Sequence, residues 1–254
     1  MSFIYAMSDI HGYDEAFEEA LQLVDLDSNE RNKLILLGDY VNKGPNSKHV
    51  LYKIYQLSCR YPKQIIVLRG NHDEMFLQWL LDKDDTFLQK SALTTIRSFS
   101  PKKFLKKKSR KPKTIHLNRA RKKILKKHQP LIDWMQTLLF YYETDTQIFV
   151  HAGILEDAES WKHQTPKEYF LEKRPPETGA FYKDIIAGHV NSAEVSDNKQ
   201  YLGKVYWDKK SHYYIDGNAK LSGIIPVLKY NQKNKTYTSF QRDTTGKWSE
   251  YLIK

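Results

Sequence analysis

Short apolar runs alternate with amphipathic stretches over the first 190 residues of this chain. In the stretches 14–24 and 47–57, apolar residues recur at helical intervals. Strand-length runs that alternate with helices are typical of an α/β fold, in which helices cover the faces of a layered sheet. The strand-like runs are FIYAM (3–7), KLILL (33–37), QIIVL (64–68), QIFV (147–150) and DIIA (184–187).

The apolar pattern changes after residue 200, where the runs are shorter and polar turn-like stretches divide them. This spacing predicts antiparallel strands joined by turns. Pro226 predicts that the third run is an edge strand or contains a bulge. The sequence shows no internal repeat and no linker, so we predict a single domain over residues 1–254 with a β-rich C-terminal third. The runs are KVYW, HYYI, GIIPVLKY and KTYTSF.

Positive charge is concentrated in one segment of the chain. The formal net charge is +11, yet the window 86–132 contains 16 Lys and Arg and no Asp or Glu. This window therefore carries +16, and the remainder of the chain carries −5. We predict a basic helical segment at about 98–128, with Leu117, Ala120, Ile124 and Leu131 on one helical face.

Two interpretations of the basic segment remain open. It is either an amphipathic helix with a solvated basic face or, over 101–127, a docking surface for an acidic partner or nucleic acid. Clustered lysines would give either partner a long-range, salt-sensitive attraction. No module that reads base sequence is present in the sequence, so base-specific recognition is not expected.

Composition limits the class of protein. Apolar residues make up 40% of the chain, which is enough for a sizeable core. There is no basic leader region and no apolar run of 18 residues, so we expect no membrane insertion and a cytoplasmic location. Cys59 is the only cysteine, which excludes an intrachain disulfide, and its helical context predicts a small buried residue. Four histidines outside any ligand pattern are interpreted as surface residues: His116, His128, His163 and His212.

Side chains that can bind metal follow all five strand-like runs. In open α/β sheets the carboxyl ends of the strands form the ligand crevice, so we expect these groups to converge. Imidazole and carboxylate together suit Mn, Fe, Zn or Ni, whereas a shell of oxygens alone suits Mg or Ca. Two such metals can share a carboxylate and a water, which becomes a nucleophile near neutral pH. The side chains are those of Asp9, His11, Asp39, Asn71, His72, His151 and His189.

The same stretches resemble the ordered motifs of a known family. SDIHG, GDYVNKG, RGNHD, VHAG and GHV are similar to motifs of the calcineurin-like metallophosphoesterases. The likeness is greatest to the bacterial branch of the serine/threonine phosphoprotein phosphatases, which is itself similar to symmetrical diadenosine tetraphosphate hydrolases. It runs from about residue 3 to 191 and resumes in YIDGNAKLSGIIPVLKY. The resemblance implies an α/β fold, the four-layer α/β/β/α metallophosphatase sandwich with two mixed sheets.

The resemblance also implies which residues hold two divalent transition metal ions, with Mn as the first expectation and Fe, Zn or Ni as alternatives. Asp39 would bridge both ions. The first ion would be held by Asp9, His11 and Asp39, and the second by Asp39, Asn71, His151 and His189.

Catalytic and phosphate-binding roles follow from the same resemblance. His72 would be the general acid that protonates the leaving oxygen, and Asn42 stands where the family has the residue that orients it. Substrate phosphate would be contacted by Arg69, Asn71 and Lys43. Arg174 is matched to a further arginine of the bacterial branch, although Pro175 and Pro176 depart from the pattern.

One motif departs from the family pattern GDxxDRG, because this chain reads GDYVNKG. Asn42 can accept a hydrogen bond but offers no negative charge to an imidazolium, so we expect a lower pKa for His72. General acid catalysis is typically worth about 10²–10⁴-fold, and part of it should be lost. Lys43 keeps a positive charge without the planar bidentate fork of Arg, so phosphate binding should weaken.

All six metal ligands are nevertheless retained, which favours a slower, metal-competent enzyme over one that has lost its activity. The predicted function is hydrolysis of phosphomonoesters, with phosphoserine or phosphothreonine of proteins as the expected substrate. The first alternative is a dinucleoside polyphosphate (diadenosine tetraphosphate) hydrolase. The second is a weakly active or non-catalytic relative that binds phosphate or nucleic acid.

Overall fold

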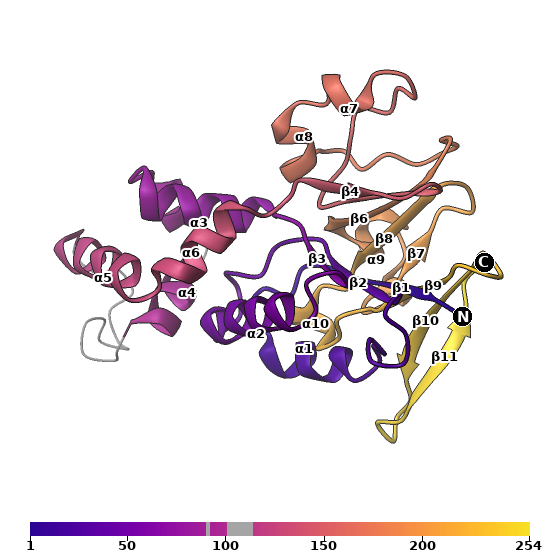
Figure 1. Ribbon diagram of the computed structural model, residues 1–254, viewed down its shortest axis with the longest axis horizontal. Helices are drawn as coiled ribbons and strands as arrows, with labels where there is room; N and C mark the ends of the chain where they lie inside the picture. Colours follow the sequence, from indigo (N-terminus) through magenta and orange to yellow (C-terminus); the bar gives the residue numbers. More distant parts are fainter. Residues whose placement is uncertain (90–91, 101–113) are drawn as a thin grey trace.

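The computed structural model describes residues 1–89, 92–100 and 114–254, and its centre is a pair of mixed β-sheets (Figure 1). The first sheet has the strand order β11-β10-β9-β1-β2-β3, and the second has the order β4-β5-β6-β8-β7. The bounds are β1 Phe3–Met7, β2 Lys33–Leu36, β3 Ile65–Val67, β4 Tyr141–Glu143, β5 Gln147–Val150, β6 Asp184–Asn191, β7 Tyr206–Trp207, β8 His212–Asp216, β9 Leu228–Asn231, β10 Thr236–Arg242 and β11 Trp248–Leu252.

Each sheet has a parallel core that brings strand ends together. β1, β2 and β3 pair in parallel, β9 pairs antiparallel to β1, and β10 and β11 continue this sheet with antiparallel pairs. In the second sheet β5, β6 and β8 pair in parallel, with β4 and β7 antiparallel at the two edges. The loops that follow β1, β2 and β3 therefore leave the same edge of one sheet, and those after β5 and β6 leave the same edge of the other.

Alternating side chains show how the layers pack. Tyr5 and Met7 of β1 point to a core shared with the helices, whereas Ile4 and Ala6 point to a core between the two sheets. In β8, Tyr213 faces the core between the sheets, and Tyr214 faces a third core on the outer side. Because strand side chains alternate with a period of two, these three cores require four layers. The fold is the predicted α/β/β/α sandwich with two mixed sheets.

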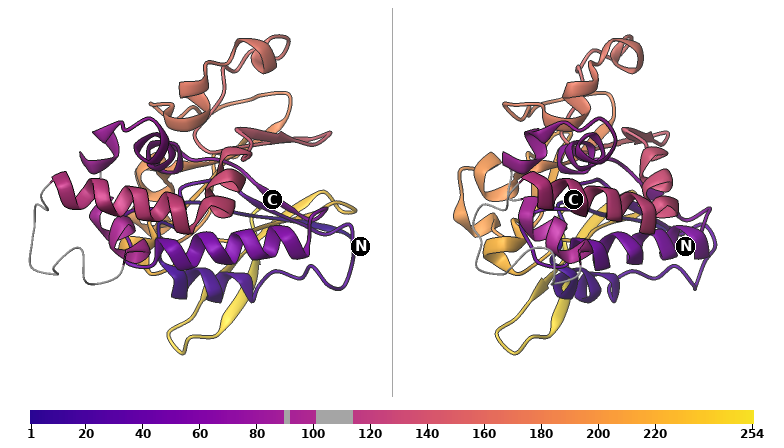
Figure 2. Two further views of the ribbon diagram at one scale, coloured as in Figure 1. Left: turned by 60° about the vertical axis from the view of Figure 1, so that its left-hand side comes forward. Right: turned by 90° about the vertical axis from the view of Figure 1, so that its left-hand side faces the viewer.

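The helices cover the two outer faces (Figures 1 and 2). The core of the first sheet includes residues of α1 to α6, and the outer core of the second includes residues of α7 and α8. The bounds are α1 Asp14–Leu21, α2 Ser47–Arg60, α3 Asn71–Leu81, α4 Ala92–Phe99, α5 Thr114–Lys127, α6 Gln129–Gln136, α7 Trp161–Gln164, α8 Lys167–Glu172, α9 Ser192–Val195 and α10 Ala219–Ser222; short 3-10 turns span Asp85–Gln89 and Lys199–Tyr201.

The basic segment is described only in part, because residues 101–113 lie outside the described residues. Its second half is the helix α5, which buries Ala120 and Ile124 against the core as expected. Leu131 does not continue that face. It lies in a separate helix, α6, which begins after His128 with Pro130 in its first turn, where proline favours a new helix start.

Three further expectations are wrong. β9 begins at Leu228, after Pro226, and pairs on both sides with β1 and β10, so it is not an edge strand. Cys59 is exposed, since it lies on the solvent side of α2. His128 and His212 are buried rather than at the surface. Hydrogen-bonding partners inside the fold, Tyr52 for His128 and Glu156 for His212, make their burial possible.

Across residues 1–89, 92–100 and 114–254, no helix is long and apolar enough to cross a membrane. The single-domain organisation and the cytoplasmic location stay predictions.

Candidate metal centre and active site

The structure brings the residues that follow the strand-like runs to one place between the two sheets. Asp9 and His11 follow β1, Asp39 follows β2, and α3 begins at Asn71 just after β3. His151 follows β5, and His189 lies near the end of β6, where the pairing with β8 shifts register. The predicted convergence of these side chains at the strand ends is thus observed.

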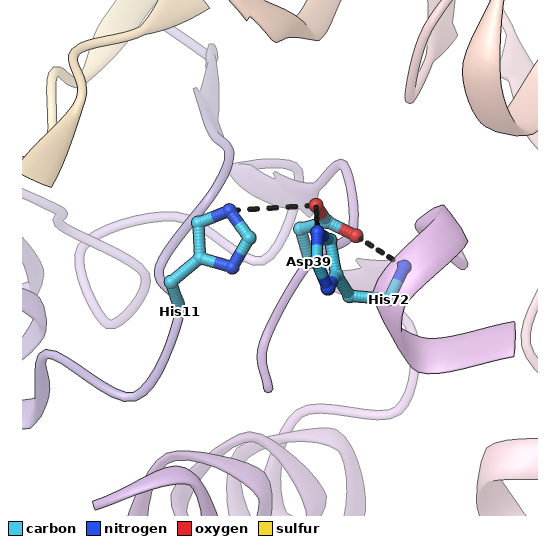
Figure 3. Close-up of side chains that lie close together, drawn as sticks. All are labelled: His11, Asp39 and His72. Carbon is cyan, nitrogen blue, oxygen red and sulfur yellow. Dashed lines mark hydrogen bonds and ion pairs between the residues drawn. The ribbon is translucent and has the colours of Figure 1, made fainter. Parts of the chain in front are cut away.

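Asp39 lies at the centre of the cluster, and its two carboxylate oxygens face different histidines. Oδ2 lies 3.4 Å from His11 Nε2 and 3.9 Å from His72 Nε2. Oδ1 lies 3.6 Å from His151 Nε2 and accepts a hydrogen bond from the backbone N–H of His72 at 2.9 Å. Figure 3 shows the Asp39 carboxylate between His11 and His72. A carboxylate in this position can bridge two metal ions.

The other donors surround this carboxylate. Asp9 Oδ1 lies 3.5 Å from His11 Nε2, and Asn71 Oδ1 lies 3.3 Å from His151 Nε2. The rings of His151 and His189 are 5.2 Å apart. Two overlapping groups have ligand atoms within 4.8 Å of one another: His11, Asp39 and His72, and Asp9, Asp39 and His151.

Backbone carbonyls fix which ring nitrogen is free to bind a metal. His11 Nδ1 lies 2.9 Å from the carbonyl oxygen of Val41, and His151 Nδ1 lies 3.1 Å from that of Leu37. A ring nitrogen that faces a carbonyl must carry the proton, so Nε2 of each ring presents a lone pair toward the carboxylates. Imidazole nitrogens whose lone pairs face carboxylates fit a pair of divalent transition metal ions.

Left-handed backbone conformations turn the ligands inward. Six non-glycine residues of the site have positive φ, which costs energy for residues with a Cβ and is concentrated at functional sites. They are Asp9, His11, Asp39, Asn42, Lys43 and His189, with φ between 49° and 70°.

Two glycines allow the backbone to approach the ligands closely. A Cβ on Gly188 would collide with Ser8 Oγ and Asp9 Oδ2, and a Cβ on Gly70 would collide with the Asp39 carboxylate. Neither glycine has a positive φ, so the requirement for glycine here is steric.

Burial and neighbouring charges together shift the pKa values of the site residues. Burial would raise the pKa of Asp9, but the hydrogen bond with His11 and the charge of His151 outweigh it, and the pKa lies well below its usual range. Burial lowers the pKa of His189 to about 4, with a further contribution from His151. Burial also lowers the pKa of His72 to about 4, because the opposing charge of Asp39 is partly offset by His11 and Lys43.

Asn42 holds His72 through a fixed amide. Asn42 Nδ2 lies 2.7 Å from His72 Nδ1, while Asn42 Oδ1 accepts a hydrogen bond from Thr95 Oγ1 at 3.0 Å. The backbone N–H of Asn42 in turn donates to Thr95 Oγ1 at 2.8 Å. Because Thr95 takes the amide oxygen, the amide nitrogen is the group that faces the His72 ring.

Two contributors were missed by the sequence analysis. Thr95 lies in α4, 53 positions from Asn42, and no local motif indicates this contact. Asp73 accepts the backbone N–H groups of Asp39 at 2.7 Å, Tyr40 at 3.0 Å and Gly70 at 3.1 Å. Burial and the charge of Asp39 raise the pKa of Asp73 to about 7. The motif RGNHD contained the signal for Asp73, since an aspartate there can tie two loops together.

The predicted phosphate-binding arginines are both engaged with protein groups. Arg69 is buried, and its guanidinium contacts Glu74 at 2.6 Å and the carbonyl oxygens of Met135 and Gln136 at 3.1 and 2.7 Å. Arg174 is half exposed and pairs with Glu194 at 2.8 Å. Their contact with substrate phosphate stays a prediction, as do the roles of the other site residues.

A hollow of about 240 Å³ opens beside Asn71, between α3 and α8. Its polar lining is mainly acidic, although Glu74 is paired with Lys167 at 2.6 Å. The lining residues are Asn71, Glu74, Met75, Gln78, Lys167, Glu168, Leu171 and Glu172.

A shared carboxylate among histidines at the strand ends of a two-sheet sandwich is the arrangement expected of a two-metal hydrolase. The comparison with protein families agrees: the calcineurin-like phosphoesterase family matches residues 4–223, and the chain belongs to this family.

Curated relatives share part of this sequence. The symmetrical bis(5'-nucleosyl)-tetraphosphatase of Chromobacterium violaceum is 40% identical over 70 residues, which are 28% of this chain and 24% of that protein. The enzyme of the same name from Buchnera aphidicola subsp. Schizaphis graminum is 27% identical over 191 residues, which cover 74% of this chain and 57% of that protein. In both cases the match spans less than two thirds of the relative.

Solved structures share the fold. A cold-active protein tyrosine phosphatase of a psychrophilic Shewanella species superposes with a TM-score of 0.61 at 15% identity, covering 99% of this chain and 80% of that one. A protein serine/threonine phosphatase from Saccharomyces cerevisiae gives a TM-score of 0.53 at 14% identity, covering 100% of this chain and 80% of that one. At these identities the likeness concerns the fold alone.

Proposed function

We propose that this protein is a dinuclear-metal-dependent hydrolase of phosphoric esters or anhydrides. The observation that carries the proposal is the Asp39 carboxylate, with Oδ2 toward His11 and Oδ1 toward His151. Bound divalent ions, with Mn as the first candidate, would polarise a phosphoryl group and activate water at neutral pH. The residues that would hold them are Asp9, His11, Asp39, Asn71, His151 and His189.

The remaining site residues would bind the substrate and handle the proton. His72 lies beside Asp39 and is the candidate donor to the leaving oxygen. Lys43 would attract the phosphoryl oxygens as a point charge. Arg174, which is half exposed, would reach phosphate by leaving Glu194.

The preferred substrate class is a dinucleoside polyphosphate. Two features support it: relatives in the curated set are named symmetrical bis(5'-nucleosyl)-tetraphosphatases, and His72 is a poor proton donor here. A phosphoanhydride has a better leaving group than an alkyl ester and needs less help from a general acid. The Asn42 substitution is therefore less costly for an anhydride than for phosphoserine.

A second candidate is a phosphoserine or phosphothreonine in a protein, and the hollow beside Asn71 favours it. Glu168 and Glu172 in its lining would repel a polyphosphate chain and attract basic residues next to a phosphorylated one. The two candidates differ in charge: a dinucleoside polyphosphate would place negative charge beside this hollow, whereas a basic phosphopeptide would place positive charge there.

A comparison of three substrates tests the proposal. Protein loaded with Mn²⁺ is assayed with diadenosine tetraphosphate, with a phosphoserine peptide that carries flanking lysines, and with an aryl phosphate. We expect turnover of the aryl phosphate and faster turnover of diadenosine tetraphosphate. Asp39→Asn should abolish every activity, and Asn198→Asp, a change at an exposed residue that is not one of the proposed site residues, should abolish none.

Each result has a clear meaning. Faster turnover of the peptide would replace the first candidate with the second. No turnover of any substrate by Mn²⁺-loaded protein would contradict the enzymatic proposal.

A binding function at the basic segment is the third candidate. Helix α5, with the sequence TIHLNRARKKILKK, is rich in lysine and arginine and contains no acidic residue. Neutralising the lysines of α5 should abolish salt-dependent binding of a single-stranded oligonucleotide, whereas Asp39→Asn should leave that binding unchanged. Equal binding by the neutralised and native proteins would remove this candidate.

A further inference from the structure

Lys43 contacts the nitrogen with which His11 would bind metal. Lys43 Nζ lies 2.6 Å from His11 Nε2, and His11 Nδ1 faces the carbonyl oxygen of Val41 at 2.9 Å. Because Nδ1 carries the ring proton, Nε2 is the acceptor and the ammonium group is the donor. The lone pair that would coordinate a metal ion is thus occupied by a hydrogen bond from a cation.

The backbone holds Lys43 beside His11, while the side chain remains free to move. The N–H of Gly44 donates to the carbonyl oxygen of His11 at 2.7 Å, and a Cβ on Gly44 would lie 2.6 Å from that same oxygen. The backbone of Lys43, the residue before Gly44, is therefore fixed against the His11 loop. His11 is buried, but Lys43 is exposed, so its stem can swing into solvent without disturbing the core.

The two halves of the metal centre differ in what contacts the histidine nitrogen that would bind metal. His151 Nε2 faces Asn71 Oδ1 at 3.3 Å and Asp39 Oδ1 at 3.6 Å, and both are acceptor oxygens. A metal ion entering on the side of His151 meets donors that are ready to coordinate. One entering on the side of His11 has to displace an ammonium group first.

We propose that Lys43 is an internal cation that competes with the metal ion at His11, so that the two metal positions fill in order. The position formed by Asp39, Asn71, His151 and His189 fills first. The position of Asp9 and His11 fills when Lys43 moves away. This inference rests on the proposed dinuclear function and concerns the regulation of that same site.

An anion would act as the release signal. Phosphate of the substrate attracts Lys43 and draws it from His11, which frees Nε2 for the metal ion. Linkage is reciprocal, so phosphate that tightens the second metal ion is itself bound more tightly once that ion is present. The enzyme would complete its metal centre only when substrate is in place.

The test is titration of metal-free protein with Mn²⁺ by calorimetry. The native protein should show two unequal steps, and Lys43→Met should tighten the weaker step by about ten- to a hundredfold, the range of a charge-assisted hydrogen bond. Methionine keeps the unbranched stem and the same backbone preference but has no charge. The matched control is Lys48→Met, five residues along, where Nζ lies over the Tyr52 ring and the titration should match the native one.

Electron paramagnetic resonance gives a second readout. With one equivalent of Mn²⁺, the native protein should show isolated ions, because the second position stays closed. At the same loading Lys43→Met should show a substantial fraction of exchange-coupled pairs. A structural role of Lys43 would change neither the order of filling nor the coupling.

The outcomes separate this inference from the function on which it rests. If native protein and both variants bind no Mn²⁺, the dinuclear proposal fails. If all three bind Mn²⁺ with the same second step, the centre stands and the competition by Lys43 is refuted.

Discussion

Asn42 donates a hydrogen bond from Nδ2 to Nδ1 of His72, at 2.7 Å. On the other side of the amide, Asn42 Oδ1 accepts a hydrogen bond from the Thr95 hydroxyl. A His72 ring that accepts at Nδ1 carries its proton at Nε2 and is not an imidazolium. The arrangement agrees with the lowering of the pKa of His72 to about 4 by burial, and it weakens the proton donor without removing it.

Asn42→Asp should therefore raise the turnover of a poor leaving group such as phosphoserine. A carboxylate in place of the amide accepts from Nδ1–H and raises the pKa of His72, because it stabilises the imidazolium. We expect about a tenfold to hundredfold increase, part of the range attributed to general acid catalysis. The measurement is kcat against pH, and the high-pH limb of the profile should move to higher pH.

Asn198→Asp is the matched control for this change. Asn198 accepts the N–H of Gln200 outside the site, and an aspartate can do the same. An equal rise in kcat for both variants, or an unchanged profile for Asn42→Asp, would show that the amide is not what limits His72.

Gly188→Ala should abolish Mn²⁺ binding. The added methyl group would collide with Asp9 Oδ2 and Ser8 Oγ, so that Asp9 could no longer hold its position. Gly246→Ala is the comparison: nothing lies within 4 Å of the added carbon, and only its positive φ of 87° resists the change. That variant should lose about 1–2 kcal/mol of stability and keep its metal affinity. Calorimetry with Mn²⁺ and urea unfolding distinguish the two effects, and tight binding by Gly188→Ala would contradict the steric argument.

His212 should stabilise the fold more at low pH than at high pH. It is 2% exposed and lies between Glu156 at 3.0 Å and Asp208 at 3.1 Å. Burial alone would lower the pKa of His212, but the two carboxylates outweigh burial and raise it. Its contribution is therefore complete below the unfolded pKa of about 6.5 and is lost as pH rises through the higher folded pKa.

His212→Gln checks this pH dependence by urea unfolding at pH 6 and pH 9. The loss of stability relative to the native protein should be larger at pH 6 than at pH 9, because the raised pKa of His212 keeps its charged pairing at the lower pH. His163→Gln, at an exposed histidine, should show no such difference between the two pH values. An equal loss for His212→Gln at both pH values would contradict the charged pairing.

Arg69 should act mainly through stability. Its guanidinium joins Glu74 of α3 to the last carbonyls of α6, so Arg69→Met would leave Glu74 and two carbonyl oxygens without this partner. We expect a loss of about 1–3 kcal/mol in the free energy of unfolding, because two carbonyl oxygens lose a buried donor while Glu74 keeps Lys167 as its partner. KM should change little. A large rise in KM with unchanged stability would instead place Arg69 in contact with substrate phosphate.

Much of the site could be predicted from the sequence, because it depends on local order. Apolar runs form the parallel strands, and the carboxyl ends of parallel strands meet at one edge, so the residues after those runs had to converge. The order of the motifs along the chain is enough to identify Asp9, Asp39 and His151 as candidate ligands. The alternation within β1, with Tyr5 on one face and Ile4 on the other, likewise follows from the period of a strand.

Tertiary structure determines the hydrogen bonds and ion pairs that modify the properties of the site residues. Thr95 meets Asn42 across 53 residues because α4 packs against α2, and Lys43 reaches His11 because a left-handed loop sets it there. His212, expected at the surface, is buried between Asp208, four residues away, and Glu156, which comes from a distant segment. Residue types and the order of the strands can be read from short stretches of sequence. The partner of a polar side chain depends instead on packing between distant segments, which short-range patterns do not encode.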